Sequence, residues 1–154
     1  MLALLLLANS APVVAKKVLG DRWAWPIDFG TELPDGHRLF GASKTIRGVM
    51  LAVVFGWVGA PLIGLEPDLG AQVALLAMAG DLLSSFLKRR LSLPASSRAI
   101  GLDQIPESLL PQLVCIEPLG LTALDVVAGV MIFLVGGLLI SRLLFRLNLR
   151  DQPY

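Results

Sequence analysis

Residues 70–90 read GAQVALLAMAGDLLSSFLKRR, an apolar run with one carboxylate, Asp81, and three consecutive cations at its end, Lys88, Arg89 and Arg90. A helix needs about 20 mostly apolar residues to cross the hydrocarbon of a bilayer, and cations commonly close such a helix. A central aspartate costs about 2.5–3.5 kcal/mol on insertion scales, so Asp81 is expected to face a partner or a polar cavity instead of lipid. This stretch predicts a membrane-spanning helix that carries a polar site.

The rest of the chain shares this apolar character, since 55% of its 154 residues are hydrophobic. We therefore predict an all-α integral membrane protein, a single membrane-embedded domain over residues 1–154 with about five transmembrane helices. The first span is preferred over a secretory signal because its lysines, Lys16 and Lys17, follow the apolar run. The fourth span is short and polar at its start. The predicted spans are about 2–19, 46–65, 70–87, 105–118 and 121–145.

The basic residues predict how these spans are oriented. Every Lys and Arg falls at residues 16–47, 88–98 or 142–150, and the connections around 66–68 and 117–120 hold none. The positive-inside rule places the three clusters in the cytoplasm, the amino terminus outside and the carboxyl terminus in the cytoplasm, as five spans also require. We predict a multi-pass protein of the cell membrane whose active site faces the cytoplasm. Its cytoplasmic loops would be about 20–45 and 88–104.

Asp81 begins a polar face, because Ser84 and Lys88 follow it at three and seven residues and share its side of a helix. A structural contact between helices is the alternative. Asp103 stands at the start of the fourth span, four residues before Glu107, either as a helix cap or as a ligand. One hypothesis is that Asp81 and Asp103 hold Mg²⁺ together, with nucleotide phosphates completing its coordination.

A second candidate site is the stretch FGASKTIRG at residues 40–48, which leads directly into the second span. Its small residues let the backbone approach an anion, and the hydroxyl groups of Ser43 and Thr45 can donate hydrogen bonds. Lys44 and Arg47 bring positive charge to the start of a helix. The pattern indicates phosphate binding, although its spacing is not that of a P-loop and an interfacial anchor is the alternative.

Five further residues are polar or reactive. Asn9 and Ser10 lie in the first span, where helix packing and contact with a substrate explain them equally well. Asp28 belongs to a turn, and it serves either the loop structure or a nucleotide pocket. His37 is expected to be a solvated loop residue, since the chain has no second histidine to join it on a metal. Cys115, the single cysteine, is expected to be a packing residue.

Six short motifs follow one another in order from the first span to the fourth: residues 9–12, 26–28, 35–41, 43–48, 80–90 and 103–104. Together they resemble the CDP-archaeol synthase family, which is related to the CDP-diacylglycerol synthases. The chain departs from that family at Ala42, where an acidic residue is common, and at Ile46, where tryptophan is common. Residues 91–98 lack the more glycine-rich and charged form of the family.

The resemblance implies five membrane helices, cytoplasmic loops lining the active site, and use of CTP and Mg²⁺. It implies transfer of a cytidylyl group from CTP to a phosphorylated lipid, which gives a CDP-activated lipid and pyrophosphate for phospholipid synthesis. An archaetidate-like and a phosphatidate-like substrate both remain open. The expected partners are CTP, the phosphorylated lipid and membrane lipids; a homo-oligomer is also considered, and no nucleic acid is expected.

For this activity the catalytic residues would be Asp81, Lys88, Lys44 and Arg47. The nucleotide and its phosphates are assigned to Ser43, Lys44, Thr45, Arg47, Arg89, Arg90 and Asp28. The lipid is assigned to Asn9 and Ser10, and Mg²⁺ to Asp81 and Asp103. The alternatives are a transporter or channel-like protein that uses Asp81 as an ion site, and a catalytically inactive family member that acts as a membrane scaffold.

Overall fold

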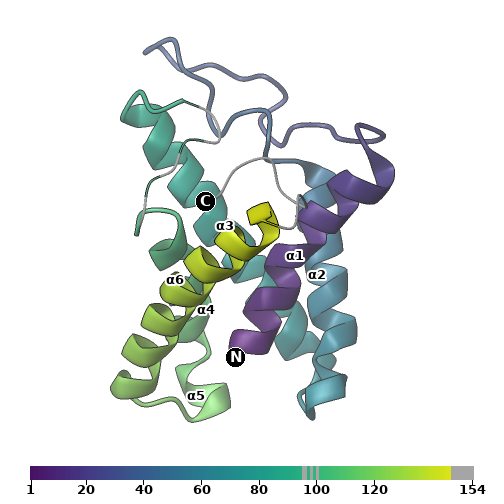
Figure 1. The fold of residues 1–154 in the computed structure, drawn as a ribbon, viewed down its shortest axis with the longest axis vertical. Helices are drawn as coiled ribbons and strands as arrows, with labels where there is room; N and C mark the ends of the chain where they lie inside the picture. Colours follow the sequence, from purple (N-terminus) through teal and green to yellow (C-terminus); the bar gives the residue numbers. More distant parts are fainter. Residues whose placement is uncertain (95–96, 98, 100, 147–154) are drawn as a thin grey trace.

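The computed structural model of the chain is a helical bundle that describes residues 1–94, 97, 99 and 101–146. Its long helices α1, α3 and α6 run from the end that holds the amino terminus toward the opposite end, and α2 and α4 run back (Figure 1). The elements are α1 (Leu2–Leu19), α2 (Ile46–Gly59), the 3-10 helix η1 (Pro61–Ile63), α3 (Pro67–Arg90), α4 (Gln104–Val114), α5 (Ile116–Leu119) and α6 (Ala123–Arg146).

Four of the described helical segments are long and apolar enough to cross a membrane. They correspond to the predicted spans 2–19, 46–65, 70–87 and 121–145, and they confirm an all-α membrane protein. The predicted span 105–118 is not one continuous helix, because the chain is divided at Cys115 into α4 and α5. With 11 residues, α4 rises only about 16 Å, roughly half of what a bilayer core requires.

The first three helices pack closely because their contact surfaces consist of small residues. The buried core between them includes Ala8, Ala52, Ala74 and Ala77. Where α2 crosses α3, a Cβ atom on Gly56 would collide with the Gly70 carbonyl oxygen, and one on Gly70 would collide with Gly56. Small residues let two membrane helices approach at backbone distance, where dispersion forces hold them together.

The short helix α4 packs against α3 and α6. A Cβ atom on Gly80 of α3 would collide with the backbone of Pro106 and Glu107 at the start of α4. On the other side of α4, the buried side chain of Gln112 contacts Gly129 of α6. Gly80 therefore lets the first turn of α4, with its acidic residues, lie directly against the polar part of α3.

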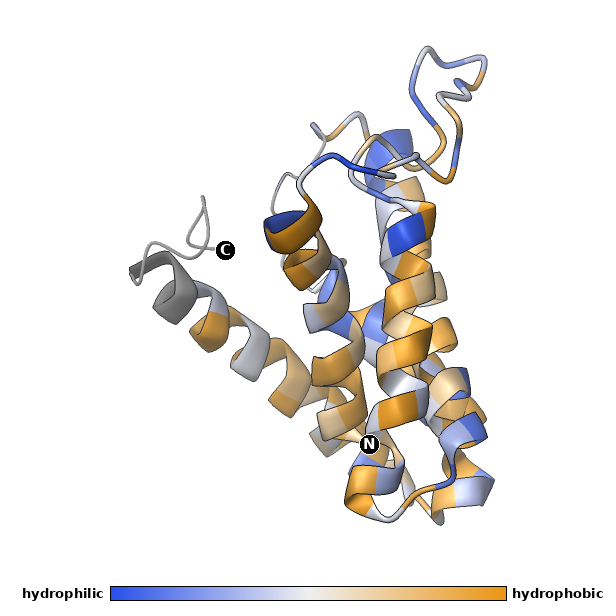
Figure 2. Ribbon diagram, turned by 90° about the vertical axis from the view of Figure 1, so that its right-hand side faces the viewer, coloured by the Kyte–Doolittle hydropathy of each residue, from blue (hydrophilic) through white to orange (hydrophobic). Residues whose placement is uncertain are grey.

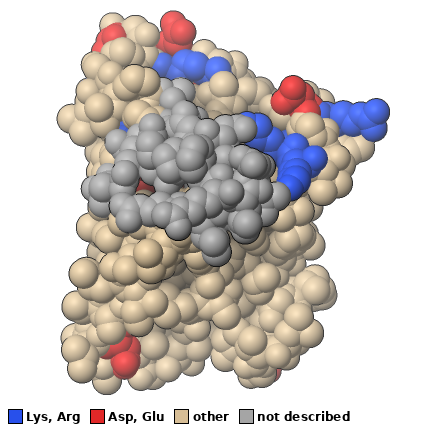
Figure 3. Space-filling view, in the orientation of Figure 1, with Lys and Arg blue, Asp and Glu red and all other residues tan. Residues whose placement is uncertain are grey.

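Polar and apolar residues are separated along the bundle (Figure 2). The helices are apolar over most of their length. The described Lys and Arg residues gather with the loops at the end opposite the amino terminus, the charged end of the bundle, whereas Asp68 and Asp125 start helices at the other end. Lys and Arg lie toward that end of the face drawn in Figure 3. Of the predicted basic clusters, Arg98, Arg150 and the side chains of Arg142 and Arg146 lie outside the described residues.

The loop of residues 20–45 covers this charged end. Two isolated antiparallel bridges, Pro26 with Thr45 and Glu32 with Arg38, fold it back on itself. Gly20 ends α1 and Thr45 caps α2, its hydroxyl oxygen accepting a hydrogen bond of 3.2 Å from the Gly48 amide. The loop is therefore an ordered turn structure tied to both helices, which positions the residues that follow it.

Candidate active site

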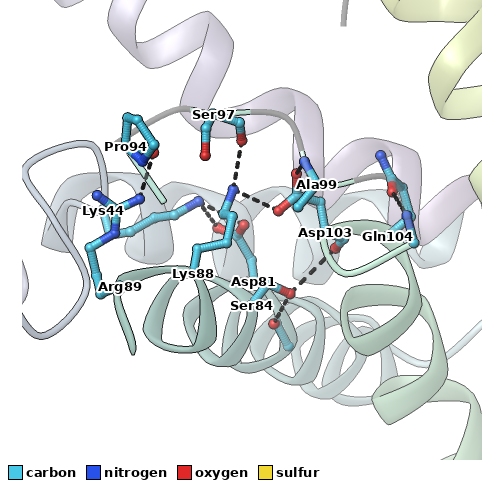
Figure 4. A network of polar contacts seen from close by, with 12 residues as sticks. Lys44, Asp81, Ser84, Lys88, Arg89, Pro94, Ser97, Ala99, Asp103 and Gln104 are labelled. Atoms are coloured by element: carbon cyan, nitrogen blue, oxygen red, sulfur yellow. Dashed lines mark hydrogen bonds and ion pairs between the residues drawn. The ribbon is translucent and has the colours of Figure 1, made fainter. Parts of the chain in front are cut away.

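Asp81 has a cationic partner from the loop. The Lys44 ammonium lies 2.6 Å from each of the two carboxylate oxygens of Asp81 (Figure 4). The two residues are 37 positions apart in sequence. Their side chains are 23% and 29% exposed, so the pair is only partly shielded from water. Asp81, which would be costly in lipid, is thus neutralised by Lys44, one of the predicted phosphate-binding residues.

A second ion pair lies two helical turns further along α3. The Lys88 ammonium is 2.6 Å from Asp103 and also donates to the Ser97 carbonyl oxygen at 3.2 Å (Figure 4). Asp103 makes no capping hydrogen bond to α4; its other carboxylate oxygen accepts from the Ala99 amide. Ser84, between the two pairs, donates to the Gly80 carbonyl oxygen. The structure therefore brings the two predicted metal-binding aspartates to one polar face of α3.

The first ion pair borders a small cavity of about 60 Å³. The lining includes Pro12 of α1, Ser43 and Thr45 of the loop, and Asp81 of α3. Two predicted nucleotide-binding residues, Ser43 and Thr45, thus face the same space as the Lys44–Asp81 pair. The cavity is the point at which the first span, the loop and the third span meet.

Glu107 is a carboxylate that the sequence reasoning did not assign to the site. It lies close enough to Asp81, Lys44 and Asp103 to interact with them electrostatically, and the side chain of Asn9 lies beside it. The signal that could have found it was its spacing of four residues from Asp103, which places both on one side of a helix. The Asn9 carbonyl oxygen Oδ1 is buried and has no hydrogen-bond partner among the described residues.

No group of three or more acidic, histidine or cysteine side chains is arranged to hold a metal within the part of the chain that the structure describes. The carboxylates instead alternate with lysines, as Lys44 contacts Asp81 and Lys88 contacts Asp103. This mixed arrangement suits a ligand that carries both negative oxygens and a cation, because each lysine and each carboxylate would then exchange its present partner for one on the ligand.

Asp28 organises the loop and is 4% exposed. Its carboxylate forms an ion pair with Arg38 and accepts hydrogen bonds from the backbone amides of Gly30, Phe40 and Gly41. Burial raises the pKa of this carboxyl, but Arg38 and the three amides outweigh burial and lower the pKa to about 2. The predicted nucleotide-binding residue is thus fully engaged inside the loop.

Arg89 and Arg90, two of the predicted phosphate-binding residues, donate to backbone carbonyl groups. Arg89 bonds the Pro94 oxygen at 2.7 Å, and Arg90 bonds the His37 and Arg38 oxygens at 3.2 and 3.0 Å. Arg90 also pairs with Asp35 at 2.7 Å. The structure places Arg89 and Arg90 where they connect the loops to the end of α3.

Arg47, in the first turn of α2, has other partners than Lys44, which precedes this helix. Its guanidinium donates to the Gly20 and Arg22 carbonyl oxygens, at the carboxyl end of α1. The residues that line the cavity beside Asp81 include Thr45 and Gly48, whereas Arg47 lines a separate groove on the outside of the bundle. The structure does not bring Arg47 together with the Lys44–Asp81 pair.

Three other residues from the sequence analysis have local contacts. Ser10 is exposed and its hydroxyl donates to the Leu7 carbonyl oxygen within α1. The His37 imidazole lies 3.1 Å from the Ser92 hydroxyl oxygen. Cys115 is fully buried in the core, in agreement with a packing role.

The fold and the site together define a class: an all-α membrane protein with two lysine–carboxylate ion pairs, one of them bordering a small cavity, at one end of its spans. The model of CarS-like CDP-archaeol synthases matches residues 2–154. A CDP-archaeol synthase from Pyrobaculum arsenaticum is 41% identical over 112 residues, which cover 70% of this chain and 66% of that protein. One from Sulfurisphaera tokodaii is 37% identical over 135 residues, or 84% of this chain and 81% of that protein.

The fold itself also matches a known protein. A solved structure, described as giving structural insight into an intramembrane enzyme for archaeal membrane lipids biosynthesis, has a TM-score of 0.75 and 32% identity, and the match covers 90% of each chain. The chain belongs to the CDP-archaeol synthase family, as its motifs predict. Its activity is therefore CTP-dependent transfer of a cytidylyl group to an archaeal lipid phosphate, a step of membrane lipid synthesis.

Proposed function

We propose that the lipid phosphate and CTP meet at the two ion pairs of α3 and that this site faces the cytoplasm. The observation that carries the proposal is the pairing of Lys44 with Asp81 and of Lys88 with Asp103, both at 2.6 Å, at the basic end of the bundle. Two lysines can neutralise phosphate oxygens, and two carboxylates can accept a divalent cation. Without substrate, the same groups neutralise one another.

The reaction forms a bond between a lipid phosphate oxygen and the α-phosphorus of CTP. The bond from that phosphorus to the oxygen bridging to the β-phosphate breaks, and pyrophosphate leaves. Such transfers depend on positioning and on neutralisation of the developing charge, without a covalent protein intermediate. We assign Lys44 and Lys88 to these phosphates. Lys88 is 8% exposed, so its charge acts where water screens it weakly.

The residues of the site fit Mg²⁺. This ion takes oxygen ligands, and proteins commonly hold it by one or two carboxylates with substrate phosphates and water. We assign Asp81 and Asp103 as its carboxylates, since a phosphate could take over the lysine that each now contacts. When bound, the ion would supply further neutralisation of phosphate charge. Glu107 interacts with both aspartates and would help to orient them around the ion.

The lipid is proposed to be the ether-linked archaetidate, because the relatives are CDP-archaeol synthases. Asn9 supports an approach of its head group from α1, since this residue lies beside Glu107 at the site. The amide of asparagine has two N–H donors, and these can donate to the oxygens of a lipid phosphate. Phosphatidate, with the same phosphate and ester-linked chains, is the comparison substrate.

The orientation of the chain is part of the proposal. In Figure 1, α4 and α5 lead from the charged end back to the end that holds the amino terminus. We propose that they complete the fourth of five crossings, with help from the contacts of α4 to α3 and α6. The amino terminus would then be outside and the carboxyl terminus in the cytoplasm, in accordance with the positive-inside rule.

An ion pathway is the weaker alternative. Lys44, Asp81, Lys88 and Asp103 gather at one end of the bundle, and they do not trace a polar path through it. At the other end, the Asp125 carboxylate accepts hydrogen bonds from the Thr122 amide and hydroxyl groups. A transporter typically carries its ionisable groups along a route across the membrane.

The test is conversion of CTP into a CDP-lipid by the purified, reconstituted protein, with archaetidate and phosphatidate offered separately. We expect Mg²⁺-dependent product with archaetidate, stopped by EDTA. Asp81→Asn and Lys44→Met should each lower kcat/KM by about 100-fold or more, a typical loss for groups that stabilise transition-state charge. The matched control is Asp68→Asn, an acidic residue in the first turn of the same helix.

Glu107→Gln tests the third carboxylate. It should raise the Mg²⁺ concentration needed for half-maximal activity by about tenfold, as loss of groups around a metal site commonly does. Glu117→Gln, on α5, is its control. Full activity of folded Asp81→Asn would overturn the assignment of the site, and a preference for phosphatidate would overturn the assignment of the lipid.

A further inference from the structure

A second hollow lies on the outside of the bundle, between the carboxyl end of α1 and the amino end of α2. It has a volume of about 340 Å³ and is lined by Leu19, Trp23, Trp25, Arg47, Met50 and other apolar atoms. We call it the tryptophan groove. It is separate from the cavity beside Asp81, which takes the other side of the first turns of α2. The activity proposed above does not require it.

The walls of the tryptophan groove are unusually exposed apolar side chains. Trp23 is 65%, Trp25 63% and Met50 63% exposed. Trp23 has a φ of 54°, the left-handed region that a bulky residue rarely adopts. Tryptophan is enriched where the head groups of a bilayer meet its hydrocarbon, because one part of its ring system is apolar and its N–H is polar. The groove lies at the charged end of two candidate spans, where that boundary is expected.

The rim of the tryptophan groove is positive. Arg47 donates to the Gly20 and Arg22 carbonyl oxygens, which carry no full charge. No carboxylate lies within 4.0 Å of its guanidinium among the described residues, and its buried Nε has no hydrogen-bond partner there. Lys16, Lys17 and Arg22 are exposed on the neighbouring turn and loop, against one acidic residue of that segment, Asp21. The charge of Arg47 is therefore available to an anion.

We infer that the tryptophan groove binds an anionic phospholipid of the bilayer. One chain of the lipid would lie against Trp23, Trp25 and Met50, and its phosphate would approach Arg47. An apolar groove with a cation at its edge complements a molecule that joins an apolar chain to a phosphate. This assigns Arg47 to a lipid head group at the membrane surface instead of to the nucleotide. It also gives a reason for the two exposed tryptophans.

The two tryptophans provide the test, because the chain holds only three, and the third, Trp57, is in α2. Trp57→Phe leaves both fluorophores in the groove. This protein is placed in vesicles of unlabelled phosphatidylcholine. A small, equal mole fraction of either phosphatidylglycerol or phosphatidylcholine, brominated near the carbonyl end of the chains, is added to separate samples. Bromine quenches tryptophan on contact. We expect phosphatidylglycerol to quench more effectively, equivalent to about fivefold enrichment, since one interfacial cation contributes about 1 kcal/mol.

Arg47→Gln should abolish most of this preference, and Arg47→Lys should keep it because the charge remains. Lys16→Gln is the matched control, since it removes the same charge from a nearby position outside the groove lining, and it should keep most of the preference. Equal quenching by the two lipids in the parent protein would overturn the inference without any variant. So would a preference that survives Arg47→Gln, or quenching by neither lipid because a second copy or a peptide covers the groove. The readout needs no CTP, so a failed activity assay leaves it unaffected.

Discussion

At the scale of single residues, Asp28 shows how the loop above the cavity keeps its shape. A buried carboxylate is stable only when it is paired and hydrogen bonded. Arg38 and three backbone amides provide those contacts, and the pKa of Asp28 falls from 3.8 to about 2. The same loop delivers Lys44 to Asp81. The contacts of the Asp28 carboxylate therefore help to hold the loop that positions Lys44 beside Asp81.

The depressed pKa makes the loop sensitive to acid. A folded-state pKa below the unfolded value stabilises the loop at pH above about 4, and this stabilisation is lost as the pH falls through 2. The contribution is on the order of 2 kcal/mol. We expect Asp28→Asn to speed hydrogen exchange of the Gly30 and Gly41 amides about tenfold at neutral pH. Asp21→Asn, an exposed loop aspartate, is the control; equal effects of the two variants would contradict the argument.

At the scale of the helices, close contacts between small residues set the positions of the functional groups. Gly56 and Gly70 bring α2 and α3 together, and Gly80 admits the first turn of α4. Lys44 precedes α2, Asp81 lies on α3, and Asp103 precedes α4. A shift of any of these helices by the thickness of a methyl group would therefore move a charged partner.

Gly56→Ala tests this packing. The new methyl group would collide with the Gly70 carbonyl oxygen and the Ala74 side chain, at a cost of roughly 1–3 kcal/mol. We expect a lower midpoint of thermal or denaturant unfolding in detergent. Gly136→Ala of α6 is matched, because a methyl group there meets nothing within 4 Å, and it should be neutral or slightly stabilising. A Gly56→Ala protein as stable as the parent would show that the two helices separate at no cost.

At the scale of the whole molecule, the distribution of charge along the bundle determines how it sits in a bilayer. The apolar surfaces of the helices form the middle, and the described Lys and Arg residues lie toward one end (Figures 2 and 3). Exposed large hydrophobic residues on α2, α3 and α6, such as Val54, Leu75 and Leu139, would face lipid. The proposed site and the tryptophan groove lie at the charged end, where polar substrates arrive from water and lipids from the membrane.

The proposed orientation predicts which positions a membrane-impermeant maleimide labels in right-side-out vesicles or cells. Asp68→Cys, between α2 and the body of α3, should react from the outside. Asp35→Cys, in the loop of residues 20–45, should react only after the membrane is opened. Cys115 is fully buried and serves as the unlabelled background. The reverse pattern would show that the bundle is inserted the other way round.

The sequence by itself determined the membrane class and four of the spans, and it singled out four charged residues that the structure pairs, Lys44, Asp81, Lys88 and Asp103. These features are local: runs of apolar residues, single charges inside them, and short motifs such as residues 43–48 can be recognised without knowing the fold. The fourth predicted span was the exception. Its residues are apolar enough on average, but the stretch contains Pro111 and Pro118, and the helix is interrupted at Cys115. Proline lacks the amide hydrogen that a continuous helix requires.

The tertiary structure alone decided which polar residues meet. Lys44 and Arg47 are three residues apart, yet one contacts Asp81 and the other turns to the end of α1. Glu107 joins Asn9 and the aspartates, although no pattern assigned it to the site. The direction of each side chain depends on the rotation of its helix and the path of the loop. Both are set by contacts between distant segments, such as Gly56 with Gly70, which no local pattern contains.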